Sequence, residues 1–395
     1  MSTRPTEKRS GGSATRDRDV VAGSLATRLR RRIEADGPLP FARFMEIALV
    51  DPVDGYYTAA RARPTRSGDY LTAPELHPIF GHCLAHQIIE VWERLDRPGS
   101  FMLREYGAGA GTLALAVLDE IRRAAPPLLE GLRYEPVEVN PHRLAELRAG
   151  LEAAGFAARL HEPDDGPRVG VVLANEYLDA LPVHRFVVRD GRLRERYVDW
   201  SGERFVEVEG PPSDPEAATA AARLAAAAPG TVVEVRPAVG RWLETVAAVL
   251  RRGVAIVVDY GGSAGELFGP HHPEGTLAAY RHHRVAPDPL AEPGEQDLTA
   301  HVDFTDLEAR AAGLGLRVLG STSQAAFLVG CGLEDLLRRE QSSPTATLED
   351  LLLLRSAVRR LLDPRALGNF RVVVLGRGIE PPLSGLSARL PGAAR

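Results

Sequence analysis

The segment 105–112, EYGAGAGT, limits most strongly what this chain can fold into. It follows a short apolar run at 101–103 and leads into apolar residues at helical spacing, which predicts a strand, a glycine turn and a helix. Glycines at the alternate positions Gly107, Gly109 and Gly111 let a ligand approach bare backbone. A dinucleotide-binding turn reads G-x-G-x-x-G, and counting from Gly107 its last position is occupied here by Thr112.

Including Glu105, the run reads E-x-G-x-G-x-G, which resembles the first nucleotide-binding motif of Rossmann-like S-adenosylmethionine (SAM) methyltransferases. The next predicted strand, 133–139, carries Glu138 near its end, followed by Val139. A carboxylate there can accept hydrogen bonds from both ribose hydroxyls of a nucleoside. Together these features favour a nucleoside-binding site over a turn with only a structural role. A NAD-dependent oxidoreductase is the alternative on a related fold, and the missing third glycine counts against it.

Composition narrows the class of protein. The chain has 395 residues, 44% of them hydrophobic and 26% charged, which is typical of a globular protein. A net charge of −5 with mixed signs predicts no nucleic-acid surface, and no apolar run reaches the ~20 residues of a membrane span. Only Cys83 and Cys331 are present, so we expect no disulfide framework, no cysteine-rich zinc site and a cytoplasmic location. His82 and His86 have metal-ligand spacing but no third ligand nearby, so we expect no metal.

From residue 101 the predicted strands and helices alternate, which indicates an α/β fold with a parallel sheet between two layers of helices. We expect a Rossmann-like, seven-stranded core of the class I methyltransferase type, with the last two strands as a candidate antiparallel hairpin. The strands are predicted near 101–106, 133–139, 157–161, 169–174, 254–259, 315–321 and 370–376.

The regions outside the core complete the expected organisation. We divide the chain into a disordered tail (1–20), an N-terminal helical extension with a cofactor lid (21–100), the first half of the core (101–182), a β-rich insertion between the fourth and fifth strands that covers the substrate (183–236), the second half of the core (237–378) and a loose C-terminal tail (379–395).

The segment 68–75, GDYLTAPE, has two interpretations. As local structure, Thr72 and Glu75 form a capping box at the start of a helix. As part of the site, Gly68, Asp69, Thr72, Pro74 and Glu75 form a lid over the cofactor. The residues alone favour neither interpretation.

Polar side chains also follow the fourth predicted strand. Asn175, Glu176 and Asp179 lie at its carboxyl end, the edge at which open α/β sheets bind ligands. The alternative is that Asn175 only caps a short helix. The polar run 297–301 is a candidate lining of a substrate channel, and 259–262 is a candidate edge of the site.

Several motifs in the same order resemble the MidA family of class I SAM-dependent methyltransferases, which includes the mitochondrial complex I assembly protein-arginine methyltransferase. The resemblance covers about residues 37–378, with Ala110 and Asn140 as departures from the family pattern. The matching segments are 55–57, 68–75, 105–113, 137–139, 175–186, 259–261, 275–277 with Tyr280, 297–304, 322–324 and 327–328.

The resemblance implies SAM as the cofactor, S-adenosylhomocysteine (SAH) as the product, and a protein or peptide with an arginine acceptor as the substrate. It leaves open a respiratory-chain subunit as that substrate, and also a homodimer. The expected cofactor-binding residues are Gly68, Asp69, Thr72, Pro74, Glu75, Glu105, Gly107, Gly109, Gly111, Thr112, Glu138, Val139, Asn175 and Glu176.

Arginine as an acceptor makes a specific demand on the site. Its guanidinium stays protonated at neutral pH, so carboxylates are needed to hold it and to take up its proton. We expect Glu176 and Asp179 in that role, with Asn175 and His301 completing the catalytic set and Asp69 and Glu75 in support. A small-molecule or peptide N- or O-methyltransferase remains an alternative, as does an assembly factor that binds SAM without turnover.

Overall fold

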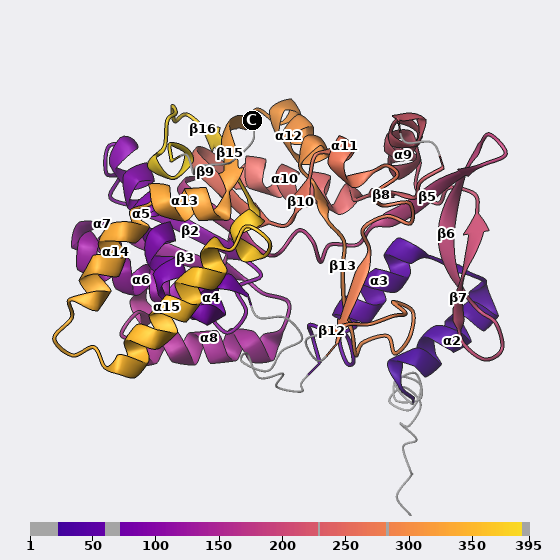
Figure 1. Ribbon diagram of the computed structural model, residues 1–395, viewed down its shortest axis with the longest axis horizontal. Helices are drawn as coiled ribbons and strands as arrows, with labels where there is room; N and C mark the ends of the chain where they lie inside the picture. Colours follow the sequence, from indigo (N-terminus) through magenta and orange to yellow (C-terminus); the bar gives the residue numbers. More distant parts are fainter. Residues whose placement is uncertain (1–22, 60–71, 228–229, 282–283, 389–395) are drawn as a thin grey trace, which may run out of the picture.

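The computed structural model describes residues 23–59, 72–227, 230–281 and 284–388 (Figure 1). The expected tail 1–20 lies outside these residues, and so do Gly68 and Asp69 of the expected lid. No helix of the described part is both long and apolar enough to cross a membrane.

The central sheet has the strand order β3-β2-β4-β9-β16-β15. Its strands are β2 (Phe101–Tyr106), β3 (Leu132–Val137), β4 (Arg168–Asn175), β9 (Leu250–Asp259), β15 (Arg317–Ser323) and β16 (Arg371–Arg377). The first four in this order are parallel, and β16 runs antiparallel to both β9 and β15. The α/β class with a mixed sheet is therefore as expected, and so is the final antiparallel pair.

The described part of the central sheet has six strands and not the expected seven. Residues Ala157–Arg159 form a short 3-10 helix, η2, and only Leu160 bridges to Tyr134 of β3. In this segment Phe156 is buried, whereas the alanines after it are exposed and Pro163 follows closely. A strand here would bury too little side chain to extend the ladder.

Alternation along the strands divides the core between the two faces of the sheet. Leu103, Leu173 and Ile256 pack on one face, and Met102 and Val172 on the other. The first face is covered by α5 (Ile79–Arg94), α6 (Thr112–Ala124), α8 (Pro141–Ala153), α13 (Gln324–Gly330), α14 (Leu333–Gln341) and α15 (Leu348–Leu362); the second is covered by α10 (Pro237–Val249) and α12 (Phe304–Gly313) (Figure 1).

A second sheet is built from the stretch between β4 and β9 together with the N-terminal region. Its order is β1-β6-β5-β8, with β7 beside β6. The strands are β1 (Leu39–Pro40), β5 (His184–Arg189), β6 (Arg192–Trp200), β7 (Phe205–Gly210) and β8 (Val233–Val235). Helices α2 (Leu25–Asp36) and α3 (Phe41–Val50) share a core with this sheet, so they join the insertion, whereas α5 belongs to the main core.

Short elements complete the described chain. The three-stranded sheet has the order β12-β11-β13, and β10 pairs with β14. The bounds are α4 (Ala73–Leu76), α7 (Pro126–Gly131), α9 (Pro215–Ala227), α11 (Ala264–Leu267), β10 (Gly261–Gly262), β11 (Ala278–Arg281), β12 (Arg284–Val285), β13 (Asp297–Thr299), β14 (Val302–Asp303), η3 (Leu367–Asn369) and η4 (Ser384–Leu386).

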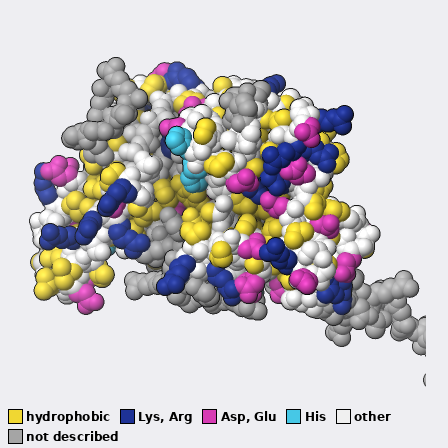
Figure 2. Space-filling view, turned by 45° about the vertical axis from the view of Figure 1, so that its right-hand side comes forward, with side chains coloured by type: hydrophobic (Ala, Val, Ile, Leu, Met, Phe, Trp, Pro, Cys, Tyr) yellow, Lys and Arg dark blue, Asp and Glu magenta, His cyan; other side chains and the backbone are white. Residues whose placement is uncertain are grey.

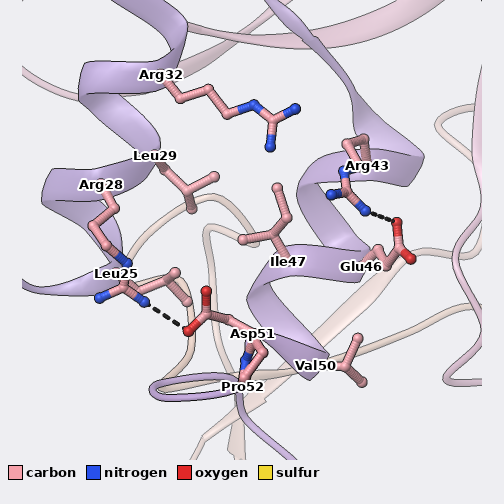
Figure 3. Close-up of a pocket in the computed structure, with 10 residues that line it drawn as sticks. All are labelled: Leu25, Arg28, Leu29, Arg32, Arg43, Glu46, Ile47, Val50, Asp51 and Pro52. Atoms are coloured by element: carbon pink, nitrogen blue, oxygen red, sulfur yellow. Dashed lines mark hydrogen bonds and ion pairs between the residues drawn. The ribbon is translucent and has the colours of Figure 1, made fainter. Parts of the chain in front are cut away.

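Between α2 and α3 lies a surface hollow of about 360 Å³ (Figure 3). Arg28 spans its lower end, with ion pairs to Asp51 at 2.6 Å and Asp54 at 2.7 Å. These ion pairs connect the segment that follows α3 to α2. On the face shown in Figure 2, acidic and basic side chains are intermixed.

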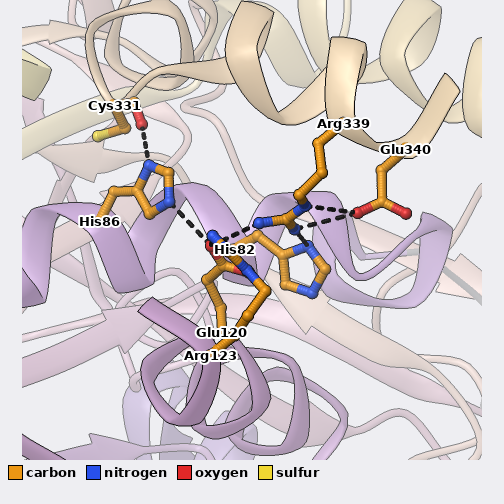
Figure 4. Close-up of polar contacts among 7 residues, drawn as sticks. All are labelled: His82, His86, Glu120, Arg123, Cys331, Arg339 and Glu340. Atoms are coloured by element: carbon orange, nitrogen blue, oxygen red, sulfur yellow. Dashed lines mark hydrogen bonds and ion pairs between the residues drawn. The ribbon is translucent and has the colours of Figure 1, made fainter. Parts of the chain in front are cut away.

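A polar network joins α5, α6 and α14 (Figure 4). The Glu120 carboxylate is paired with His86 Nε2 at 2.9 Å and with Arg339 Nη1 at 2.8 Å. Burial raises the pKa of Glu120, but hydrogen bonds from His86, Arg123 and Arg339 outweigh it and hold the pKa well below its usual range. The histidine pair thus has a structural role, and the described residues contain no group of three side chains placed to hold a metal ion.

The expected loose tail from residue 379 is wrong for residues 379–388. Leu383 is fully buried, and the Gly385 N–H donates to Gln87 Oε1 of α5 at 3.0 Å. Ser384 donates through both its N–H and its hydroxyl to Glu90. An apolar anchor and these hydrogen bonds offset the entropy lost when the segment packs.

Candidate active site

A cavity of about 420 Å³ lies at the carboxyl ends of β2, β3 and β4. Such a volume is typical of a small-molecule site. The expected site residues that line it are Thr72, Pro74, Glu75, Glu105, Gly107, Gly109, Thr112, Glu138, Val139, Asn175, Glu176 and Asp179. Most of the residues that the sequence predicts for the site, spread over more than 100 positions, therefore meet in one place.

The glycine turn between β2 and α6 has a left-handed backbone at Gly107, Gly109 and Gly111, with φ of +69°, +54° and +85°. A Cβ on Gly109 would meet no described atom within 4 Å, so this residue borders open space. A Cβ on Gly111 would lie 2.9 Å from Leu147 Cγ of α8. Gly111, expected to bind the cofactor, does not line the cavity; it allows the turn to pack against α8.

Glu138 lies one residue after β3 and organises the glycine turn. Its Oε2 accepts from the Gly109 N–H and its Oε1 from the Asn140 N–H, both at 2.8 Å. An ionised carboxylate offers about four acceptor positions, so it retains capacity for a ligand hydroxyl. Asn140 in turn caps α8 through the His142 N–H at 2.9 Å and donates to the Tyr57 carbonyl at 2.6 Å. The departure at Asn140 thus serves as a helix cap.

Glu105 is buried at the end of β2 and accepts the Tyr134 hydroxyl at 2.6 Å. Burial raises the pKa of Glu105 to about 8. This carboxyl group therefore holds its proton at neutral pH in the protein as it stands, and a nearby cation would favour its ionised form.

The two interpretations of the segment around Thr72 prove compatible. Thr72 and Glu75 form a capping box at the start of α4, with Thr72 N–H donating to Glu75 Oε2 at 3.3 Å. Both residues also line the cavity. The next N–H, on Ala73, donates to Glu176 Oε1 at 3.2 Å, which fastens α4 to the loop after β4.

That loop carries the acids expected to act on the acceptor. Glu176 has a left-handed backbone, with φ of +49°, and its N–H donates to the Val258 carbonyl at 2.8 Å. A non-glycine residue in this conformation costs energy and is held by its surroundings. Burial raises the pKa of Glu176 to about 8, and the neighbouring Asp179 carboxylate acts in the same direction.

Asp179 is only 5% exposed. Its Oδ2 accepts the Tyr260 hydroxyl at 2.5 Å, whereas its Oδ1 is buried with no hydrogen-bond partner among the described residues. Asn175 Oδ1 is likewise buried with no hydrogen-bond partner among the described residues. Thr299 Oγ1, also on a residue that lines the cavity, is a third such atom. Unpaired buried polar atoms are costly, so the cavity is suited to a ligand that carries hydrogen-bond donors.

Two buried side chains, Asp259 and Arg236, hold this loop through hydrogen bonds to its backbone. Asp259 at the end of β9 accepts from the Leu178 N–H at 2.9 Å and the Asp179 N–H at 3.3 Å. Arg236 donates to the carbonyls of Asp179 at 3.1 Å and Leu181 at 2.8 Å. It also reaches the Ala300 carbonyl at 2.9 Å. Nothing in the local sequence around Arg236 predicts this role, because its partners are far away along the chain.

His301 does not line the cavity, contrary to its expected catalytic role. Its ring packs edge-on against Tyr260, with the ring centroids 5.4 Å apart, and burial lowers its pKa. Tyr260 lines the cavity in its place. Asp297 and Thr299 of the predicted channel lining border the cavity as well. Further residues, to which the sequence gave no role, also line it: Tyr56, Tyr57, Arg143, Tyr177 and Tyr280. Several of them could have been predicted, because they lie in the motif segments that carry the family resemblance.

Comparisons with known proteins identify the class to which the chain belongs. A family model described as "Putative S-adenosyl-L-methionine-dependent methyltransferase" matches residues 83–322. The mitochondrial protein arginine methyltransferase NDUFAF7 homolog of Drosophila melanogaster is 31% identical over 393 residues, covering 90% of this chain and 86% of that protein. Its Homo sapiens counterpart is 28% identical and covers 86% and 80%, respectively.

A solved structure gives the same result. A COG1565 superfamily protein from Burkholderia thailandensis, bound to SAH, has a TM-score of 0.80 and 33% identity, with 92% of this chain and 94% of that chain covered. The fold and the cavity define a SAM-dependent methyltransferase. This chain belongs to the MidA family of these enzymes, as its motifs indicated. The expected cytoplasmic location is wrong, because the relatives are named as mitochondrial proteins.

Proposed function

We propose that this enzyme methylates the guanidinium of an arginine in a protein, and that Glu176 and Asp179 receive this group. The observation that carries the proposal is the Asp179 Oδ1 acceptor, which is buried and has no partner among the described residues. A guanidinium supplies the donors that this oxygen lacks. The names of the curated relatives, protein arginine methyltransferases, support the same acceptor.

Bound SAM supplies an electrophilic methyl group, and the carbon–sulfur bond breaks as the carbon–nitrogen bond forms. The residues of the chain orient the acceptor and accept the proton that its nitrogen loses. A carboxylate whose pKa lies near 8 is a stronger base than an ordinary one, and Glu176 meets that condition. Asp179, held by Tyr260, keeps the guanidinium oriented.

The remaining assignments are part of the proposal. Glu105, Gly107, Gly109, Thr112, Glu138 and Val139 hold the nucleoside and amino-acid parts of the cofactor, and the α4 segment from Thr72 to Glu75 covers it. The second sheet covers the substrate side. The motif resemblance leaves open a respiratory-chain subunit as the protein that carries this arginine.

The test is methyl transfer from radiolabelled SAM to an arginine peptide library and to extract of the host lacking the gene, with the site read by mass spectrometry. We expect labelled arginine with the wild type and a loss of about 100-fold or more in turnover with Glu176→Gln, at nearly unchanged SAM affinity. Glu135→Gln, which alters a buried carboxylate of the same sheet outside the cavity, is the matched control. We expect this control to lower the melting temperature without lowering turnover per folded molecule.

Label on a small molecule instead of a protein would favour the small-molecule alternative. SAM binding without any transfer would favour the assembly factor without turnover.

A further inference from the structure

The wall of the cavity formed by β11 and β13 carries polar side chains on one face. Asp297 is paired with Tyr280 across the two strands, and Thr299 follows two residues later on the same face. All three line the cavity. Leu298 between them points the other way and is buried with α2 and α3 in a separate core. Strand alternation thus fixes one carboxylate and one tyrosine ring toward the site.

Tyr57, from the N-terminal extension, holds this carboxylate. Its hydroxyl donates to Asp297 Oδ1 at 2.7 Å across 240 positions of sequence. Its carbonyl accepts from Asn140, next to the nucleoside-binding Glu138. Burial raises the pKa of Tyr57 well above its ordinary value, and the carboxylates of Asp297 and Asp179 act in the same direction. The phenol therefore remains a donor, and it lies within the field of both acids.

A second, independent observation, from the loop after β4, points to a ligand in the same cavity. Asp179 is 95% buried, lines the same cavity, and has one oxygen without a partner among the described residues. Asp297 and Asp179 come from different parts of the chain and line the cavity together with tyrosine side chains. A cation with several donors and a flat face complements such a lining.

We propose that Asp297, oriented by Tyr57, is a specificity-determining residue that selects a guanidinium over an ammonium as the acceptor group. This inference rests on the proposed function and deepens it, because Glu176 and Asp179 alone do not account for the Tyr57–Asp297 pair. A guanidinium presents donors in a fixed plane that two separate carboxylates can share, and its face can lie against a tyrosine ring. An ammonium is compact and more strongly hydrated, and it reaches fewer of these acceptors.

The experiment measures binding of two small probes to the full chain saturated with SAH. Methylguanidinium and methylammonium chlorides are titrated by calorimetry at constant ionic strength. We expect the wild type to bind methylguanidinium roughly fivefold or more tightly than methylammonium. Asp297→Asn should weaken methylguanidinium binding roughly tenfold or more, the effect of losing a hydrogen bond to a charged group. Tyr57→Phe, which removes only a hydroxyl, should weaken it several-fold.

Matched controls come from the second sheet, outside the cavity. Tyr197→Phe removes a hydroxyl that donates to the Pro211 carbonyl, and Asp199→Asn alters an acid on the same strand. Both should bind the probes as the wild type does. SAH affinity should change less than about twofold in all four variants. Equal binding of the two probes by the wild type would overturn the inference, and so would unchanged methylguanidinium binding in Asp297→Asn or a parallel loss of SAH affinity.

The outcomes also separate this inference from the proposed function. Methylguanidinium selectivity that depends on Asp297, without transfer to arginine, would refute the proposed reaction and leave the recognition site standing. Arginine methylation by an Asp297→Asn variant with normal acceptor KM would refute the recognition site and leave the reaction standing.

Discussion

We expect the rate of methyl transfer to rise with pH through the ionisation of Glu176. Burial and the nearby Asp179 carboxylate raise the pKa of this group to about 8, so its neutral form predominates at pH 7. Only the ionised form can accept the proton that the acceptor nitrogen loses. Replacing the residue with glutamine removes this titration while keeping a side chain of similar shape.

The size of the effect follows from the pKa. With a pKa of about 8, roughly 1% of the molecules carry ionised Glu176 at pH 6, about 9% at pH 7 and half at pH 8. The value of kcat/KM should therefore rise about 50-fold between pH 6 and pH 8 and then level off. Bound SAM carries a positive sulfonium, which favours the ionised form of Glu176. The rise of kcat with pH should therefore occur at lower pH than the rise of kcat/KM.

The assay measures initial rates of SAH release at constant ionic strength, with an acceptor peptide identified as above. Glu176→Gln should lose most of the turnover, and the rise of its rate between pH 6 and pH 8 (the acid limb of the profile) should disappear. Glu105 also has a pKa raised to about 8, so Glu105→Gln tests whether that residue is the source. The limb should persist in Glu105→Gln. A wild-type profile that is flat from pH 6 to pH 8, or a limb that survives in Glu176→Gln, would refute the reasoning.

Three further predictions concern the cofactor and the loop after β4. Gly109→Val should abolish SAM binding in a folded protein, because the valine side chain would enter the cavity. Gly111→Ala should instead lower the melting temperature, because the added methyl group would contact α8. Wild-type SAM affinity in a folded Gly109→Val protein would contradict the first prediction. Glu138→Gln should weaken SAM binding roughly tenfold or more, and less for an analogue without ribose hydroxyls; equal losses for both ligands would exclude a ribose contact. Arg236→Lys should lower kcat with SAM affinity nearly unchanged, because lysine cannot reach all its carbonyl partners. Arg104→Lys, a control at a buried arginine of β2 that does not line the cavity, should lose stability but keep kcat.

The local sequence determined the half of the site that lies next to β2 and β4. A strand followed by alternate glycines predicts its own turn, because the backbone at Gly107 and Gly109 needs a left-handed conformation that few other residues adopt. Polar residues directly after β4 lie at the carboxyl edge of a parallel sheet wherever that strand is placed. Glu176 and Asp179 could therefore be named without knowledge of their neighbours.

Local pattern was insufficient where a role depends on packing. Gly111 fits the nucleotide motif, yet its missing Cβ makes room for Leu147 of another helix. His301 lies in a polar run, yet its ring packs against Tyr260, and Tyr260 lines the cavity whereas His301 does not. The segment at 157–161 has the spacing of a strand but too few buried side chains to hold one.

Only the tertiary structure decided which distant residues complete the site. Tyr57 meets Asp297, and Arg236 meets the carbonyls of Asp179 and Leu181, across long stretches of chain. A hydrogen bond between residues so far apart leaves no periodic trace in the sequence, because its partners are brought together by the packing of two sheets and not by local backbone geometry. The glycine turn is a local motif and could be predicted, whereas the cavity wall formed by β11 and β13, with Tyr57 bound to it, arises from the assembly of distant segments.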